Sequence, residues 1–159
     1  MKALKMAVYF VCSLLLLGSK LALASPPAQL TLTAPQTEVK RGSEVRVEVT
    51  ITNNSNRPIT IELTSPLCDY EVEVRDSAGN LAPDTDVKKT SDCANRMVTG
   101  RHISVQLMPR ESKKDTIPIT LFSDMSKPGK YSIQVTWKGP KEFGNVAVKS
   151  NKITVTVMP

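Results

Sequence analysis

Histidine and aromatic side chains are scarce in this sequence. His102 is the only histidine among 159 residues, and phenylalanine, tryptophan and tyrosine together make up 4%. A Ser-His-Asp or Cys-His nucleophile system would have to use that one imidazole. His102 directly precedes a predicted strand, on the opposite parity from its apolar residues Ile103, Val105 and Leu107, and no serine lies in a G-x-S-x-G elbow. We therefore interpret His102 as a surface histidine and expect no enzymatic activity.

Cysteine is also rare, and its three occurrences form no C-x-x-C pair. Together with a single histidine they do not make up a zinc site of the usual composition. Asp84, Asp86 and Asp92 could gather around calcium, but they lack the glycine and the spaced carboxylates of a helix-loop calcium site. We interpret these aspartates as part of a solvated loop and predict no metal and no cofactor.

The first 24 residues have the three parts of a secretory signal peptide. A basic start precedes an apolar run over residues 6–17, and a small-x-small pattern ends at Ala24. The run is shorter than the roughly 20 residues that cross a bilayer, and Lys20 interrupts the segment. We therefore predict cleavage after Ala24, no stable membrane span after cleavage, and a secreted or periplasmic location.

Two cysteines remain after this cleavage, Cys68 and Cys93, because Cys12 leaves with the signal peptide. An even count in an oxidising compartment favours a disulfide. We predict that Cys68 and Cys93 are joined, which would stabilise the fold by roughly 3.5 kcal/mol in the chain-entropy model. Their Cα atoms should then lie about 4.4–6.8 Å apart.

The mature chain carries only a small net charge. All 15 acidic residues lie in residues 25–159, whereas Lys2, Lys5 and Lys20, three of the 21 basic residues, lie in the signal peptide. The net charge of the mature chain is therefore 18 − 15 = +3, compared with +6 for the whole sequence. Its basic residues are scattered among acidic ones, whereas nucleic-acid binding uses clustered phosphate contacts and stacking rings. We therefore expect no nucleic-acid partner.

Apolar and polar residues alternate along most of the mature chain. In residues 44–52, Val45, Val47, Val49 and Ile51 share one parity, which is the pattern of a half-buried strand. Seven further runs and a weaker ninth repeat it, at residues 30–32, 59–63, 70–74, 103–107, 117–121, 131–137 and 153–157, with the weaker one at 146–148. Short strands separated by turns, with no helical period, predict an all-β protein. We expect a single immunoglobulin-like β-sandwich domain of about eight antiparallel strands over residues 25–159.

The alternation also predicts which residues form the core. We expect Trp137 to be largely buried. Eight branched residues should be buried with it, namely Val47, Val49, Ile61, Val72, Val105, Ile133, Val135 and Val155. Pro118 lacks a backbone donor, so its strand is expected at the edge of a sheet. Residues 53–55 spell a glycosylation acceptor, but we interpret them as a turn because Asn and Ser favour turns by local side-chain bonding.

Three segments together resemble the intracellular proteinase inhibitor family of bacteria. The first is a strand-turn-strand at residues 52–61, and the second is a strand with an Asp/Gly turn at residues 70–79. The third pairs residues 107–112 with residues 128–133, where a Pro-Gly turn leads into a strand. Members of this family are small immunoglobulin-like domains. The resemblance therefore implies this fold and, as an expectation, inhibition of proteases, but it assigns no site residue.

One stretch, residues 81–101, departs from the alternation and is polar and charged. A stretch of this length is unusual in a compact domain and is often functional or disordered. Its mixture of both signs suits the orientation of a protein surface. We predict that it contacts another protein of the cell envelope through Asp84, Asp86, Lys88, Lys89, Asp92, Arg96 and Arg101. The alternative is a mobile, solvated insertion.

Two functions remain open from the sequence. The first is a non-catalytic secreted or periplasmic binding or assembly module that acts through loops or a sheet edge, because function on such scaffolds usually sits in loops held by a rigid sandwich. The second is a secreted proteinase inhibitor, which rests on the resemblance alone. The fold does not choose between them.

Overall fold

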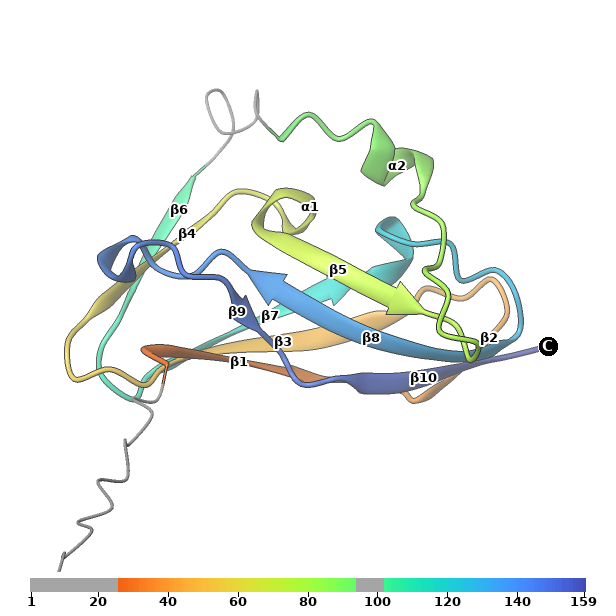
Figure 1. The fold of residues 1–159 in the computed structure, drawn as a ribbon, viewed down its shortest axis with the longest axis horizontal. Helices are drawn as coiled ribbons and strands as arrows, with labels where there is room; N and C mark the ends of the chain where they lie inside the picture. Colours follow the sequence, from red (N-terminus) through yellow and green to blue (C-terminus); the bar gives the residue numbers. More distant parts are fainter. Residues whose placement is uncertain (1–25, 94–101) are drawn as a thin grey trace, which may run out of the picture.

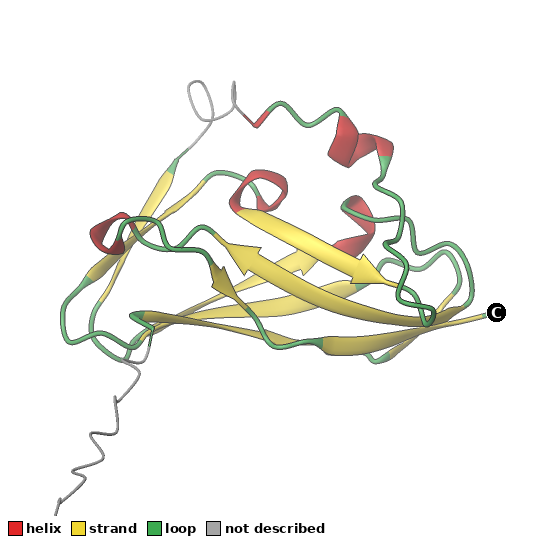
Figure 2. Ribbon diagram, viewed as in Figure 1, coloured by secondary structure: helices red, strands yellow, loops and turns green. Residues whose placement is uncertain are grey.

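Strands are the main regular structure in the part of the chain that the computed structural model describes, residues 26–93 and 102–159. In chain order they are β1 (Ala28–Thr33), β2 (Glu38–Lys40), β3 (Arg46–Asn53), β4 (Ile59–Leu63), β5 (Tyr70–Arg75), β6 (Ile103–Leu107), β7 (Ser112–Pro118), β8 (Gly129–Trp137), β9 (Val148–Lys149) and β10 (Ile153–Met158). The helices are α1 (Pro66–Asp69), α2 (Asp86–Lys89) and the 3₁₀ turns η1 (Ile119–Leu121) and η2 (Lys141–Phe143). Figure 2 shows that these helices are short and lie in the connections between strands.

The strands form two facing sheets and a small arm (Figure 1). β3 lies between β1 and β7 in a three-stranded sheet, and the second sheet has the order β2-β10-β8-β5, with β9 also paired to β8. β4 and β6 form a separate two-stranded sheet. This architecture is the predicted immunoglobulin-like β-sandwich, and the run at residues 44–52 supplies the central strand of its sheet.

Several details differ from the prediction. β2 was not predicted because Val39 is its only apolar residue, and its pairing with β10 is parallel rather than antiparallel. Residues 119–121 form η1 instead of extending a strand, because the chain turns there and the Phe122 amide donates to the Ile119 carbonyl over 2.9 Å. β7 covers Ser112–Pro118 instead of the predicted 117–121, but the strand that contains Pro118 does lie at the edge of its sheet, as predicted.

The core lies between the two sheets and consists mainly of the apolar parity of the strands. Seven of the nine predicted core residues are buried, namely Val47, Val49, Ile61, Ile133, Val135, Trp137 and Val155. The prediction is wrong for Val72 and Val105, which are only partly buried. Val72 lies on β5, an edge strand, and Val105 lies on β6 in the two-stranded arm. Each fully buried aliphatic side chain contributes about 1.5–3 kcal/mol to stability, so we assign these core residues a structural role.

Asn53 lies where the arm joins the body of the sandwich. β3 leads into β4 and β6 leads into β7, so that the two pairs form one ribbon. The ribbon bends between β3 and β4 (Figure 1). The buried Asn53 amide nitrogen donates to the carbonyls of Arg57 and Leu107 over 2.8 and 3.0 Å. Its side-chain oxygen accepts from the Ser55 amide and hydroxyl over 2.9 and 2.7 Å. Residues 53–55 are therefore a turn, as predicted, and the Asn53 side chain is inaccessible in the folded chain.

Some predictions fall outside the described residues. The signal peptide at residues 1–24 is one of them, and Arg96 and Arg101 of the predicted contact set are the others. Within residues 26–93 and 102–159, no helix is long and apolar enough to cross a membrane.

Candidate functional site

Residues 84–93, which we call the charged segment, are attached at their start to the loop that follows η1. The Thr85 amide donates to the Phe122 carbonyl over 3.1 Å. Between the same two chain segments, the Asp124 amide donates to the Pro83 carbonyl over 2.8 Å. Because these are backbone bonds in a β-bridge geometry, they fix the direction in which the charged segment leaves the sandwich.

The helical turn α2 follows directly, and the threonines on either side of it, Thr85 and Thr90, cap its two ends. The Thr85 hydroxyl accepts from the Lys88 amide over 3.1 Å and donates to the Leu121 carbonyl. At the other end, the Thr90 hydroxyl and amide donate to the Asp86 carbonyl over 2.7 and 2.9 Å. Threonine is a favoured N-cap, and an acidic first turn and a basic last turn complement the helix dipole. A stretch without strand alternation therefore forms a local helical turn.

Lys88 and Cys93 attach the rest of the charged segment to α1. The Lys88 ammonium donates to the Leu67 carbonyl over 3.4 Å and lies 5.5 Å from the centre of the Phe122 ring, which is a favourable place for a cation. Cys93 is bonded to Cys68, and their Cα atoms are 5.3 Å apart. The predicted disulfide is therefore present in the structure. The charged segment is held at its start, in its middle and at its end.

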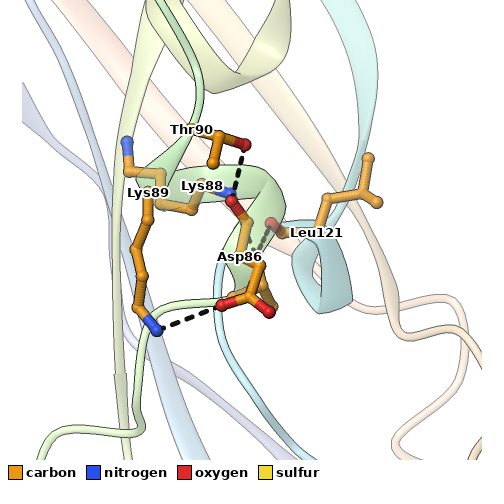
Figure 3. A network of polar contacts seen from close by, with 6 residues as sticks. Asp86, Lys88, Lys89, Thr90 and Leu121 are labelled. Carbon is orange, nitrogen blue, oxygen red and sulfur yellow. Dashed lines mark hydrogen bonds and ion pairs between the residues drawn. The ribbon is translucent and has the colours of Figure 1, made fainter.

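Most charges of this segment remain on the surface. Five of the seven predicted contact residues lie on it, namely Asp84, Asp86, Lys88, Lys89 and Asp92. All of them are exposed except Lys88, which is half-buried by the contacts just described. Asp86 and Lys89 point toward one another and form an ion pair at 3.3 Å (Figure 3). The Asp86 side chain is 96% exposed, so this pair contributes at most about 1 kcal/mol and leaves both charges accessible to a partner.

A surface cleft of about 580 Å³ borders the charged segment. Its ionisable lining consists of four carboxylates and one ammonium, those of Glu44, Asp84, Asp86, Asp124 and Lys89. Hydrogen bonds from the hydroxyl and the backbone amide of Ser126 lower the pKa of Asp124. The Ser126 amide donates to the Asp124 carboxylate over 2.9 Å. Among the residues that the structure describes, no group of three His, Cys, Asp or Glu side chains is placed to hold a metal ion. The cleft is an open and mainly acidic surface.

Sequence reasoning missed the residues that hold the charged segment in place. Leu121 ends the run 117–121 that was predicted as a strand, and Phe122 directly follows it, so that two adjacent apolar residues interrupt the alternation. Phe122 is buried and carries the Lys88 side chain against its ring. That interruption was the available signal for a turn. His102, which we interpreted as a surface histidine, is exposed.

The fold and this site define a small immunoglobulin-like β-sandwich that presents a charged, disulfide-linked segment. The profile of the intracellular proteinase inhibitor family matches residues 32–142, which is more than half of the chain. The chain therefore belongs to the intracellular proteinase inhibitor family, and the resemblance of the three segments is confirmed. The name of this family refers to inhibition of proteinases and to no catalytic activity. Comparison with curated proteins gives no match.

Several solved structures are similar to this chain at low sequence identity. The CARDB domain of the PF1109 protein from Pyrococcus furiosus, in complex with di-metal ions, has a TM-score of 0.42 and 15% identity, and the match covers 82% of this chain and 87% of that chain. A mutant β-glucosidase from Listeria innocua in complex with laminaribiose has a TM-score of 0.45 and 17% identity, and the match covers 83% of this chain but 16% of the enzyme. The likeness to the glucosidase is thus confined to a small part of that enzyme. These likenesses assign no ligand to this chain.

Proposed function

We propose that this chain is a non-catalytic binding module, secreted or periplasmic, that docks on another protein through the charged segment. The observation that carries the proposal is the attachment of that segment at three points, through Thr85, Lys88 and Cys93. A segment held in this way loses little conformational entropy on binding, so more of its contact energy becomes affinity. The signal-peptide pattern and the disulfide both support an oxidising compartment.

The surface chemistry indicates what kind of protein would fit. The charged segment exposes both signs, and the cleft beside it is mainly acidic. A complementary partner surface is rich in arginine or lysine and places an acidic residue opposite Lys89. Complementary charges orient the encounter and raise the association rate more than they raise affinity. Val87, which is 49% exposed at the centre of the same helical turn, would provide an apolar contact.

Proteinase inhibition is the second candidate, and the family membership favours it. The interface backbone of most protease–inhibitor complexes moves little on binding. An inhibitor therefore needs an exposed segment that already has its bound shape. The charged segment meets this requirement through its backbone bridge, its helical caps and its disulfide.

A pair of charge-swap variants tests the proposal. Asp86→Lys with Lys89→Glu reverses both exposed charges while it keeps the net charge and the ion pair. Glu38→Lys with Lys40→Glu makes the same exchange on the exposed strand β2 and serves as the matched control. The mature parent and both variants would be used as bait for envelope extract and tested against a panel of serine, cysteine and metalloproteases. We expect the swap on α2 to weaken binding at least about tenfold, or 1.4 kcal/mol, and the swap on β2 to leave it unchanged.

The outcomes separate the two candidates. Inhibition of one protease by the parent, reduced by the swap on α2, would identify the partner as that protease. Binding of a protein that is not a protease, reduced in the same way, would support a binding or assembly module. A partner that both variants retain equally would contradict the assignment of the site to the charged segment.

A further inference from the structure

A second hollow, of about 340 Å³, lies beside β4. One side of its lining consists of Thr60 and Glu62 of β4 and Thr64, which follows β4. The rest comes from Cys68, Asp69 and His102 and from the stretch 137–145. β4 and η2, which belongs to that stretch, contact each other and lie side by side at one end of the molecule (Figure 1). We call this hollow the β4 groove.

The pairing of β4 with β6 leaves part of the β4 backbone directed toward this groove. In an antiparallel pair the backbone groups of alternate residues point to opposite edges of the strand. The Thr60 amide donates to the Glu142 carboxylate over 2.9 Å, and the Thr64 amide donates to the Asp69 carboxylate over 2.9 Å, so both point away from β6. Glu62 lies between them on the same parity. Its N–H and C=O therefore point the same way, and they have no partner among the residues that the structure describes.

Side chains fasten the opposite wall of the groove to β4. Arg57 donates to the Glu142 carbonyl over 3.2 Å, and its guanidinium lies 4.5 Å from the centre of the Phe143 ring. The Lys141 ammonium pairs with the Glu62 carboxylate over 2.8 Å. Together with the bond between Glu142 and Thr60, these contacts fix the distance between η2 and the β4 edge.

The backbone of this wall is constrained as well. Gly139 has φ +78°, and a Cβ atom there would lie 2.1 Å from the Val146 carbonyl oxygen, so only glycine fits. Asn145, which lines the groove, has φ 53°, in the left-handed region that residues other than glycine rarely adopt. Backbone strain of this kind persists where the surroundings fix it, and it clusters at binding sites.

We propose that the β4 groove binds an extended segment of another polypeptide by strand addition to β4. Glu62 can exchange a pair of hydrogen bonds with one residue of that segment, and the Thr60 carbonyl can accept a third from the residue two positions away. Glu142 and Asp69 already occupy the amides on either side. The groove therefore admits one register and about three residues, roughly 10 Å of strand.

The charged side chains of the groove lining also indicate which residues the bound segment should carry. The Glu62 carboxylate is paired with Lys141, and the Asp69 carboxylate is hydrogen-bonded by Thr64. Lys138 is exposed in the lining, and its positive charge acts on the Asp69 carboxyl without forming an ion pair. An acidic side chain of the segment beside Lys138 would add a direct ion pair. No residue of the charged segment lines the groove, although Cys68 of the lining is bonded to Cys93 at the end of that segment. The proposed strand addition does not depend on the proposed function.

On the outward edge of β7, by contrast, the backbone groups of Lys114, Thr116 and Pro118 are partly blocked. The Thr116 amide is occupied by the Asp115 carboxylate over 2.9 Å, and Pro118 has no N–H. The Lys113 ammonium lies 3.4 Å from the Lys114 carbonyl oxygen and donates to it. Exposed edges are commonly blocked in this way against pairing with other chains. Glu62 has no such block, which favours a binding role for the β4 edge.

Two substitutions at position 62 test the proposal. Glu62→Pro removes the outward N–H and leaves the pairing with β6, since proline is tolerated on an edge strand where the amide does not pair. Glu62→Ala removes the same carboxylate and its ion pair but keeps the N–H. Linear peptides selected from a phage-displayed library on the mature parent would serve as probes. We expect them to bind Glu62→Ala within about threefold of the parent and Glu62→Pro at least about tenfold more weakly. N-methylation along the peptide should abolish binding at alternate positions.

Hydrogen exchange of the parent gives a measurement that requires no variant. In the free chain the Glu62 amide should exchange faster than the amides of Ile61 and Leu63, which face β6, and a bound peptide should slow it most. Peptide binding should also survive the charge swap at residues 86 and 89, which distinguishes this site from the charged segment. Equal binding to Glu62→Pro and Glu62→Ala would overturn the proposal. A library that yields no peptide able to slow exchange at Glu62 would overturn it too.

Discussion

Replacing Asn53 by alanine should destabilise the domain by about 2–4 kcal/mol. The side chain has no exposed surface and makes four hydrogen bonds at the bend between the sandwich and the arm. A hydrogen bond within a protein contributes about 0.5–1.5 kcal/mol net, so four of them contribute about 2–6 kcal/mol. Ser55 and Arg57 lie near the surface, where water can replace part of the hydrogen bonding that they lose with the Asn53 side chain. The expected loss is therefore in the lower part of that range.

Urea unfolding of the mature chain, followed by the fluorescence of the buried Trp137, measures this loss. With m of about 2 kcal/mol/M, the middle of the range for small proteins in urea, the midpoint should fall by about 1–2 M. Asn54→Ala is the matched control: the Asn54 side chain makes one long hydrogen bond, 3.4 Å to Gln29, and its loss should change stability by less than about 0.5 kcal/mol. Equal midpoints for the two variants would refute this account of the bend.

Asn53→Asp separates the donor role of this side chain from its shape. A carboxylate can still accept from Ser55 but has no hydrogen to give to the carbonyls of Arg57 and Leu107. Burial raises the pKa of a carboxyl at such a position above its unfolded value. The destabilisation should then be largest above that raised pKa and should shrink as the pH falls through it, because protonation restores one donor.

Three further predictions concern the core, the disulfide and a turn. Val49→Ala should cost roughly 1–4 kcal/mol of stability because Val49 is buried, and an unchanged urea midpoint would show that the β3 register is wrong. Alkylation of the native mature chain should find no free thiol, whereas two labelled cysteines would contradict the bond between Cys68 and Cys93. Backbone hydrogen bonding from Asn80 is the main cause that lowers the pKa of Asp76. Its contribution to stability should be present above about pH 4 and lost as the pH falls through the lowered pKa. The stability difference between the parent and Asp76→Ala should vanish there, and a constant difference would contradict this reasoning.

The strands were predictable because their signal is local. Alternation of side chains is a property of consecutive residues, and it placed Val47 and Val49 in the core correctly. How well a strand is covered depends on its neighbours in space, so Val72 on an edge strand and Val105 on the arm were placed wrongly. β2 has a single apolar residue, and its parallel pairing with β10 joins residues 38–40 to residues 156–158, which are far apart in the sequence. No local pattern encodes such a contact.

The candidate sites were predictable to different degrees. The disulfide followed from a count of cysteines and a compartment. The charged segment was found by its lack of alternation, but its shape depends on Thr85 as a cap and on Phe122, a residue far along the chain. The β4 groove escaped prediction because its walls, residues 60–64 and 137–145, are distant in sequence. What makes it open, the absence of a block at Glu62, is visible only once the strand pairing is known.

Photocrosslinking at Asp86 tests most directly whether the charged segment is a contact surface. A benzophenone amino acid at this position, where the native side chain is 96% exposed, reacts with whatever lies against it, so the partner can be captured before it is identified. The same probe at Glu38, exposed on β2, is the control. In cells that produce the chain, we predict one discrete crosslinked protein from position 86 and none from position 38. The same product from both positions, or no product from position 86, would contradict the proposed function.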